Sequence, residues 1–202
     1  MRRRDRDDTK ERGFFSRLAM SILGVLSCLL LIFGIFYIAT GLVTPFVAVQ
    51  GSSMEPNIHE GDLIIMVSID RYGDPIPYID GRETGYEMFG NYGDVIIYRP
   101  DGNNDRSPII HRAIAHLGKG DNLFITIDED VYVFNDMPYD GYLTKGDNKA
   151  TNHMFDQPFI SKPVKKEWII GKAKFRIPYL GYLSIIPRKI VSESFFNLPL
   201  MI

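Results

Sequence analysis

The sequence predicts a mainly β domain, either a barrel or a sandwich, that follows a single N-terminal transmembrane helix. Three observations support this fold class. No charged residue occurs between Leu18 and Met54. Beyond residue 55, short runs of branched and aromatic residues alternate with turns rich in Gly, Pro, Asn and Asp, as in all-β domains. No segment past residue 50 repeats its apolar residues at a helical period, which favours β structure over a helical or doubly wound fold.

The uncharged stretch is long enough to form a membrane-spanning helix, which we expect at residues 18–42. A helix rises about 1.5 Å per residue and needs about 20 apolar residues to cross the core of a bilayer. A cleaved secretory signal is the alternative, but its apolar region usually runs only about 7 to 15 residues. The length therefore predicts a retained anchor in contact with membrane lipid.

The charges that flank this helix predict its orientation. Residues 1–17 hold seven Arg or Lys against four Asp or Glu, although the whole chain has a net charge of -2. An excess of Arg and Lys marks the cytoplasmic side of a membrane helix. We therefore expect residues 1–17 in the cytoplasm and residues 43–202 outside the cell membrane. The basic cluster is short and holds no interleaved aromatic residues, so no nucleic-acid partner is expected.

The strands of the outer domain are expected where apolar runs lie between turn formers. In chain order, these are LIIMVSI (63–69), GDVIIYRP (93–100), SPIIHRAIAHL (107–117), the strand pair LFITIDEDVYVFN (123–135), the start of GYLTKGDNKATNHMFDQP (141–158) and WIIGKAKFRIP (168–178). Residues 71–92 are rich in Gly, Pro and Tyr and are expected to form an irregular connection. The tail from Tyr179 is apolar but broken by prolines and charges, so it should pack on the domain or lie at the membrane interface.

A pair of serines in the segment VQGSSMEPN (49–57) is a candidate source of a nucleophile. Serine, glycine and proline also form ordinary turns. A serine nucleophile needs a base and a group that orients the base, and the candidate bases are His59, His111, His116 and His153. His111 interrupts a run of β-branched residues, so it should lie on a sheet. Imidazole suits base catalysis near neutral pH, but a strand histidine can equally be structural.

The polar loop TKGDNKATNHMFDQ (144–157) contains two aspartates, Asp147 and Asp156. Gly-Asp-Asn is common turn chemistry, and Lys145 beside it is expected to be solvated. The spacing of His153 and Asp156 matches no common metal-ligand pattern, and the single cysteine, Cys28, lies in the membrane segment. We therefore expect neither a metal nor a cofactor.

Taken in order, these motifs resemble those of signal peptidase I, in the branch found in archaea and in the catalytic subunit of the endoplasmic-reticulum signal peptidase complex. The matching segments are GSSMEP with a following GD, GDVIIYR, IIHRAI, LTKGDN with a downstream aspartate, and GKAKFRIPYLGYLS. Each segment is weak evidence alone, but five in the right order after one N-terminal anchor are specific. The resemblance extends from the membrane segment to about Ser184.

This resemblance implies a serine endopeptidase that removes N-terminal signal peptides from exported preproteins, after small residues of the Ala-x-Ala kind. It implies Ser53 as the nucleophile and His111 as the general base, where bacterial members use a lysine. Asp147 and Asp156 match the two aspartates of the family, and Asp156 is preferred over Asp147 as the residue that orients His111. Gly51 replaces a serine that many relatives carry, which leaves the second oxyanion donor open.

Secretory preproteins are the expected partners, and the protein-export channel is a further candidate. An alternative function is a catalytically inactive, membrane-anchored β domain that binds or scaffolds exported proteins. A sortase-like transpeptidase is disfavoured, because such an enzyme needs a catalytic cysteine and Cys28 lies in the membrane segment.

Overall fold

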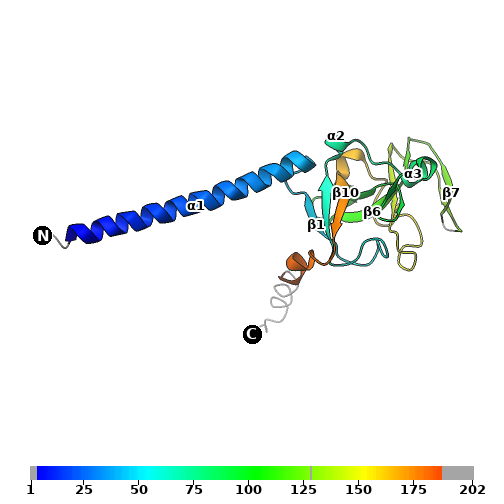
Figure 1. Ribbon diagram of the computed structural model, residues 1–202. Helices are drawn as coiled ribbons and strands as arrows, with labels where there is room; N and C mark the ends of the chain where they lie inside the picture. Colours follow the sequence, from blue (N-terminus) through cyan, green and yellow to red (C-terminus); the bar gives the residue numbers. More distant parts are fainter. Residues whose placement is uncertain (1–3, 128, 188–202) are drawn as a thin grey trace, which may run out of the picture. The chain divides into compact units, whose positions relative to one another are not determined.

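The computed structural model describes residues 4–127 and 129–187, and it divides into two units, Met1–Val43 and Thr44–Ile202. Helix α1 (Arg4–Thr40) forms the first unit and runs without interruption (Figure 1). Its segment Phe15–Thr40 has a mean hydropathy of 2.7 and is long and apolar enough to cross a membrane. The prediction of one N-terminal apolar helix of spanning length is confirmed. The helix also continues through the basic segment, whose Arg, Lys and Glu residues are good helix formers.

The second unit is built on a six-stranded antiparallel sheet, which confirms the prediction of a mainly β domain. The strand order is β1-β2-β10-β5-β6-β9, so β1 and β9 are its edges. The strands are β1 (Phe46–Ala48), β2 (Leu63–Val67), β5 (Val95–Tyr98), β6 (Ile109–Leu117), β9 (Gly141–Lys145) and β10 (Ile169–Ile177). Strand β10, the last strand among the described residues, lies between β2 and β5 and is hydrogen-bonded into the centre of the sheet.

Short elements surround this sheet. They are α2 (Ile69–Tyr72), α3 (Tyr78–Thr84), the small sheets β3 (Glu87–Met88) with β4 (Asn91–Tyr92) and β7 (Leu123–Ile127) with β8 (Asp130–Phe134), and the 3-10 turns η1 (Pro100–Gly102) and η2 (Lys166–Trp168). The expected irregular connection at 71–92 therefore holds regular structure. Ser68 caps α2 by accepting a hydrogen bond from Asp70 N–H (3.2 Å), and Gly85 ends α3 in the left-handed region.

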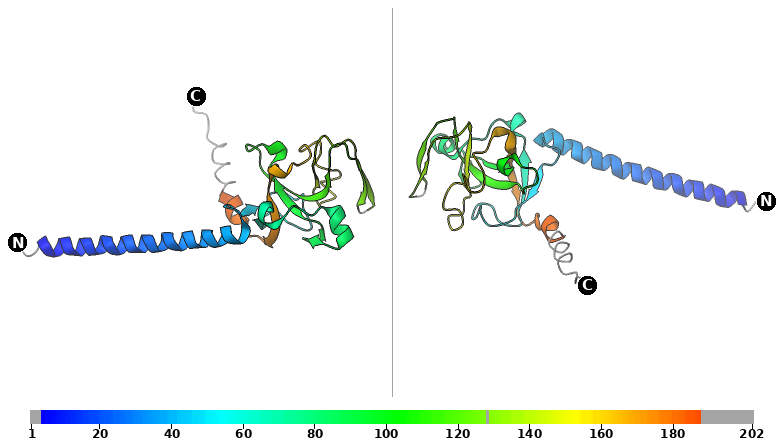
Figure 2. Two further views of the ribbon diagram at one scale, coloured as in Figure 1. Left: turned by 90° about the horizontal axis from the view of Figure 1, so that it is seen from above. Right: turned by 180° about the vertical axis from the view of Figure 1, so that it is seen from behind.

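The hairpin β7–β8 confirms the expected strand pair, and it lies at the end of the domain away from β1 (Figures 1 and 2). One face of the hairpin packs with Ile114 of β6 and Leu143 of β9 in an apolar cluster. A second cluster includes Ala113 of β6 and Tyr98 of β5. Strand β6 thus contributes neighbouring residues to two apolar clusters, and burial of an isoleucine such as Ile114 adds about 1.5–3 kcal/mol of transfer free energy. The strand that carries His111 is held firmly.

The start of the C-terminal tail packs on the β domain. Gly181 N–H donates to Gly61 O (2.8 Å), and the chain turns into a short helical stretch from Tyr182. Ile185 in this stretch is only 1% exposed. Up to residue 187 the expectation that the tail packs on the domain therefore holds. Residues 188–202, to which the same expectation applied, lie outside the described residues.

Candidate active site

Ser53 lies in a turn that begins shortly after β1 ends. Gly51, two positions before it, has a φ of 90°, a conformation that glycine adopts without strain and that would strain a serine. Met54 and Ile58 are 1% and 0% exposed and fasten the turn to the core. Ser53 itself is half-buried. The serine motif is thus a turn anchored by apolar side chains, with its second serine at the surface of a groove.

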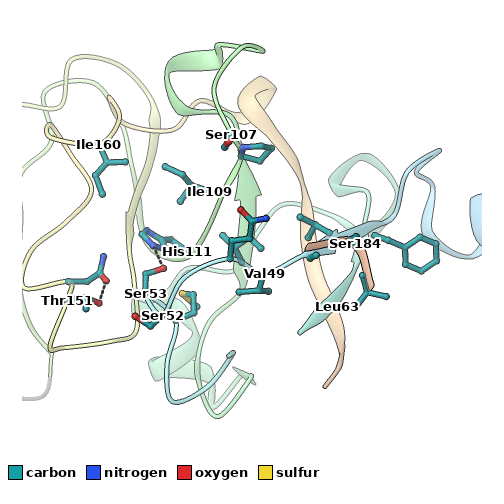
Figure 3. A pocket seen from close by; sticks show the side chains of 18 residues that line it. Val49, Ser52, Ser53, Leu63, Ser107, Ile109, His111, Thr151, Ile160 and Ser184 are labelled. Carbon is teal, nitrogen blue, oxygen red and sulfur yellow. Dashed lines mark hydrogen bonds between the residues drawn. The ribbon is translucent and has the colours of Figure 1, made fainter. Parts of the chain in front are cut away.

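His111 faces Ser53 from strand β6. Its Nε2 lies 2.9 Å from Ser53 Oγ, and its side chain is buried (Figure 3). The backbone pairing of His111 with Ile96 of β5 fixes its position along the sheet. A hydrogen bond of this length suits proton transfer from a hydroxyl to an imidazole.

Asp156 completes the contact on the other side of the imidazole ring. Its Oδ2 lies 2.7 Å from His111 Nδ1, and the carboxylate is 1% exposed. Burial raises the pKa of Asp156, but the hydrogen bond and charge of His111 and the hydroxyls of Thr144 and Tyr98 outweigh it, so the net shift is downward. An ionised carboxylate only accepts hydrogen bonds, so Nδ1 carries the imidazole proton and Nε2 is left to accept from Ser53.

Asp147 pairs with Arg112, the residue after His111 on β6. Arg112 Nε and Nη2 donate to the two carboxylate oxygens at 2.8 and 2.7 Å, and Asn57 Nδ2 donates to Oδ2 at 2.8 Å. Arg112 is 1% exposed, and its Nη1 also donates to four backbone carbonyls, those of Met88, Asn91, Tyr92 and Gly93. Of the two aspartates in the sequence motif, the structure therefore brings Asp156 to His111 and Asp147 to a buried arginine.

The Gly-Asp-Asn turn that carries Asp147 also holds the backbone of the serine motif. Asn148 N–H donates to Ser53 O (2.9 Å), and Asn148 Nδ2 donates to Ser52 O (2.8 Å). A Cβ at Gly146 would lie 2.5 Å from Ser53 O, so only glycine allows this approach. The sequence motif contained Asn148, but its spacing gave no sign that the residue holds both serine carbonyls.

Lys145 is buried, and the expectation that it is solvated was wrong. Strand β9 extends through Lys145, so the side chain is 5% exposed, lies over the ring of Tyr132 (5.4 Å) and donates to Gly146 O at 3.2 Å. The other candidate histidines lie elsewhere: His59 contacts Arg176 (3.2 Å), the His116 ring lies tilted against that of Tyr142 (centroids 4.4 Å apart) and His153 is exposed. Among the described residues, no three His, Cys, Asp or Glu side chains are grouped to hold a metal ion.

A groove of about 850 Å³ opens beside Ser53 and His111 (Figure 3). Two segments contribute most of its lining: residues 46–50, which form β1 and the two residues after it, and residues 107–111, which lead into the start of β6. The side chains of Val47, Val49 and Ile109 make much of the lining apolar. The groove can therefore accept an extended apolar chain next to the serine hydroxyl.

Comparison with known proteins gives this site its context. The family model described as signal peptidase, peptidase S26, matches residues 22–174, which cover Ser53, His111, Asp147 and Asp156. The chain belongs to this signal peptidase family. It is similar to the signal peptidase complex catalytic subunit SEC11 of three Saccharomyces cerevisiae strains, YJM789, RM11-1a and JAY291. In each case it is 30% identical over 152 residues, which cover 73% of this chain and 68% of the relative.

These similarities place this signal peptidase in the endoplasmic-reticulum and archaeal branch of signal peptidase I, a class of hydrolases that remove signal peptides. Together with one N-terminal helix of spanning length, they fit a single-pass membrane protein.

Proposed function

We propose that this chain is a membrane-anchored serine endopeptidase that removes N-terminal signal peptides from exported preproteins, with Ser53 as the nucleophile and His111 as the general base. The observation that carries the proposal is the chain of hydrogen bonds from Ser53 Oγ to His111 Nε2 (2.9 Å) and from His111 Nδ1 to Asp156 (2.7 Å). A nucleophile, a base and a group that orients the base are the three parts that acyl transfer by serine requires.

The reaction proceeds in two steps. Ser53 Oγ attacks the carbonyl carbon of the scissile peptide bond while His111 Nε2 takes the hydroxyl proton. The C–N bond then breaks, His111 gives that proton to the leaving amine, and an acyl ester remains on Ser53. Water attacks the ester, His111 takes a proton from the water and returns it to Ser53 Oγ, and the signal peptide leaves with a new carboxylate. Asp156 stabilises the imidazolium that forms in each step.

The carbonyl oxygen gains negative charge during attack and needs hydrogen-bond donors. The backbone N–H of Ser53 is the first donor in our proposal. Gly51 has no side chain to offer, and Ser52 lines the groove beside it. Ser52 is therefore the side-chain candidate for a second donor.

The substrate binds as an extended strand between β1 and β6. Val49, the residue after β1, bonds to the two residues before β2: its N–H donates to Asp62 O (2.9 Å), and its carbonyl accepts from Gly61 N–H (3.0 Å). Because backbone groups alternate along a strand, those of Ala48 and Gln50 point away from β2 toward the groove that both residues line. Edge strands of this kind bind extended peptides by main-chain hydrogen bonds.

Strand β6 supports the other side of this binding mode. Ala113 N–H donates to Asp94 O (3.0 Å), so by the same alternation Ile110 directs its backbone groups away from β5. Strand β9 pairs with β6 only from Arg112 onward. The backbone of Ile110 is thus available to a peptide in the groove. Alternate side chains of that peptide would face the apolar lining, which fits a requirement for small Ala-x-Ala-like residues.

In the same proposal, the N-terminus is cytoplasmic, α1 contacts the lipid of the cell membrane, and the β unit faces the outside. This arrangement tethers Ser53 to the membrane that preproteins cross and would bring it near preproteins that leave the export channel. The alternative, a scaffold that binds exported proteins without cleaving them, predicts no need for the Ser53 hydroxyl.

Cleavage of a model preprotein by the full chain in detergent tests the proposal. We expect the wild type to give one mature product, identified by mass spectrometry, and Ser53→Ala to give none. Ser52→Ala is the comparison variant: as the candidate second oxyanion donor Ser52 should affect the rate, but loss of its hydroxyl should leave measurable cleavage at the same bond. Near-normal turnover by Ser53→Ala would favour the scaffold.

A further inference from the structure

Three donors converge on a single oxygen of Asp156. Besides His111 Nδ1 at 2.7 Å, Oδ2 accepts hydrogen bonds from Tyr98 OH at 2.9 Å and from Thr144 Oγ1 at 2.6 Å. Within the part of the chain that the structure describes, the other oxygen, Oδ1, is buried and has no partner. The placement of the whole carboxylate therefore depends on the donors at Oδ2.

The direction of the Thr144 hydroxyl is fixed by Gln157. Thr144 N–H donates to Gln157 Oε1 (3.0 Å), which sets the amide so that Gln157 Nε2 donates to Thr144 Oγ1 (3.0 Å). A hydroxyl has one proton to give. With Gln157 occupying a lone pair, the Thr144 proton goes to Asp156 at 2.6 Å, the shorter contact, and not to Tyr98 at 3.2 Å.

Tyr98 also acts as a donor. Burial raises the pKa of its hydroxyl, so the proton stays on oxygen and points to Asp156. Tyr98 and Thr144 are both 0% exposed, and hydrogen bonds to a charged group in such surroundings are strong. Two side chains from β5 and β9 thus hold one carboxylate that in turn holds the base.

We propose that Tyr98 and Thr144 are positioning residues that fix the Asp156 carboxylate toward His111 and share its negative charge. The inference rests on the proposed function, because it assigns a role to groups behind the proposed base. Without either hydroxyl, one donor fewer shares the negative charge on Oδ2, so more of that charge acts on His111 Nδ1. Protonated His111 is then favoured, so the base is neutral only at higher pH.

The charged side chains near this network, Arg106, Arg112 and Lys145, each have partners of their own. Arg106 acts on Tyr98 from a distance and is paired with Asp101 at 2.9 Å on the surface. Arg112, the neighbour of His111, is neutralised by Asp147. Lys145, the neighbour of Thr144, donates to Gly146 O and lies over Tyr132. The Tyr98 and Thr144 hydroxyls are therefore the groups to change.

The test compares pH profiles of kcat and kcat/KM for preprotein cleavage by the full chain in detergent. We expect Tyr98→Phe and Thr144→Val each to lower kcat roughly tenfold, since a hydrogen bond to a charged group corresponds to about one order of magnitude or more. Both should move the acid limb of kcat/KM to higher pH and leave KM nearly unchanged. Thr144→Ser, which keeps the hydroxyl, should restore both properties.

Tyr86→Phe is the matched control, because Tyr86 OH donates to another buried carboxylate, that of Asp94, at 2.8 Å. It should leave the acid limb in place. A wild-type acid limb for both Tyr98→Phe and Thr144→Val would overturn the inference, even if their melting temperatures fall. If either variant does not fold, the comparison of the remaining hydroxyl variants decides. If the inference is overturned in this way but Ser53→Ala is inactive in the same assay, the proposed function still stands. An active Ser53→Ala would contradict both proposals.

Discussion

Asp147 and Asp156 contact opposite faces of strand β6, because its side chains alternate between the two faces of the sheet. His111 and Arg112 are consecutive residues of this strand, so their side chains point to opposite faces of the sheet. Asp156 meets His111 at 2.7 Å on one face, and Asp147 meets Arg112 at 2.7 Å on the other. One aspartate therefore belongs to the chain of hydrogen bonds that reaches Ser53. The other neutralises a buried cation and holds the turn on which the serine backbone rests.

Substitution of each aspartate by asparagine should separate these roles. Asp156→Asn presents the wrong partner to Nδ1, and we expect a fall in kcat of about 10⁴-fold, as for other triads of this kind. Asp147→Asn leaves Arg112 buried without its counter-charge, which typically costs about 3–5 kcal/mol. Denaturant unfolding and preprotein cleavage, measured on both variants, check the division. A stable but inactive Asp147→Asn, beside an active Asp156→Asn, would reverse our assignment.

The sequence motifs contained the three residues of the proposed hydrogen-bond chain but gave no sign of the residues that support Asp156. The resemblance to signal peptidase I singled out Ser53, His111 and Asp156 among the serines, histidines and aspartates that the motifs contain. Tyr98 and Thr144 read only as strand residues, since their contact with Asp156 depends on how β5, β6 and β9 pair. No periodicity within one segment contains that information. The prediction that Lys145 is solvated was wrong because strand β9 extends through Lys145, as far as the Gly-Asp-Asn motif.

Strand β1 is an edge strand, so the backbone groups of alternate residues point either toward β2 or toward the groove. Odd-numbered residues on both sides of β1 bond toward β2: Pro45 O accepts from Met66 N–H (2.7 Å), and Val49 N–H donates to Asp62 O (2.9 Å), just before β2. Even-numbered residues such as Ala48 face the groove. The element thus stabilises the domain along one side and is free to bind a peptide along the other.

Proline scanning of β1 should distinguish these sides. Ala48→Pro removes an N–H that faces the groove, and we expect KM to rise roughly tenfold, the value of about one hydrogen bond, with little change in melting temperature. Val47→Pro is the matched control, because Val47 lies two residues before Val49 and so directs its N–H toward its partner in β2, Ile64, and loss of that N–H should lower the melting temperature. If Ala48→Pro cleaved the preprotein with an unaltered KM, peptide binding along β1 would be wrong.

The elements themselves were predictable where pattern and length agree. The uncharged stretch predicted the apolar helix, and alternation around a turn predicted the β7–β8 pair. The prediction of an irregular connection at 71–92 was wrong, because helix α3 spans only Tyr78–Thr84 and is too short to show a helical period in the sequence. The position of β10 between β2 and β5 could not be predicted, because sheet order depends on packing between distant segments.

At the scale of the whole chain, one cysteine makes the orientation testable. Cys28 lies within the apolar segment Phe15–Thr40. In a Cys28→Ser background, we expect Asn103→Cys, in an exposed part of the β unit, to react with a membrane-impermeant maleimide in intact cells. Thr9→Cys, in the basic segment, should react only after lysis, because the Arg and Lys excess keeps it inside. The opposite labelling pattern would overturn the proposed orientation.

The central claim is that Ser53 and His111 act as one unit in peptide-bond cleavage. The most direct measurement is the kcat for a model preprotein with Ser53→Ala, His111→Ala and the double variant. When two residues act as one unit, removing the second causes no further loss of kcat. We predict that the three variants are equally inactive, with melting temperatures close to that of the wild type. Losses that multiply in the double variant, or near-normal turnover by either single variant, would contradict the account.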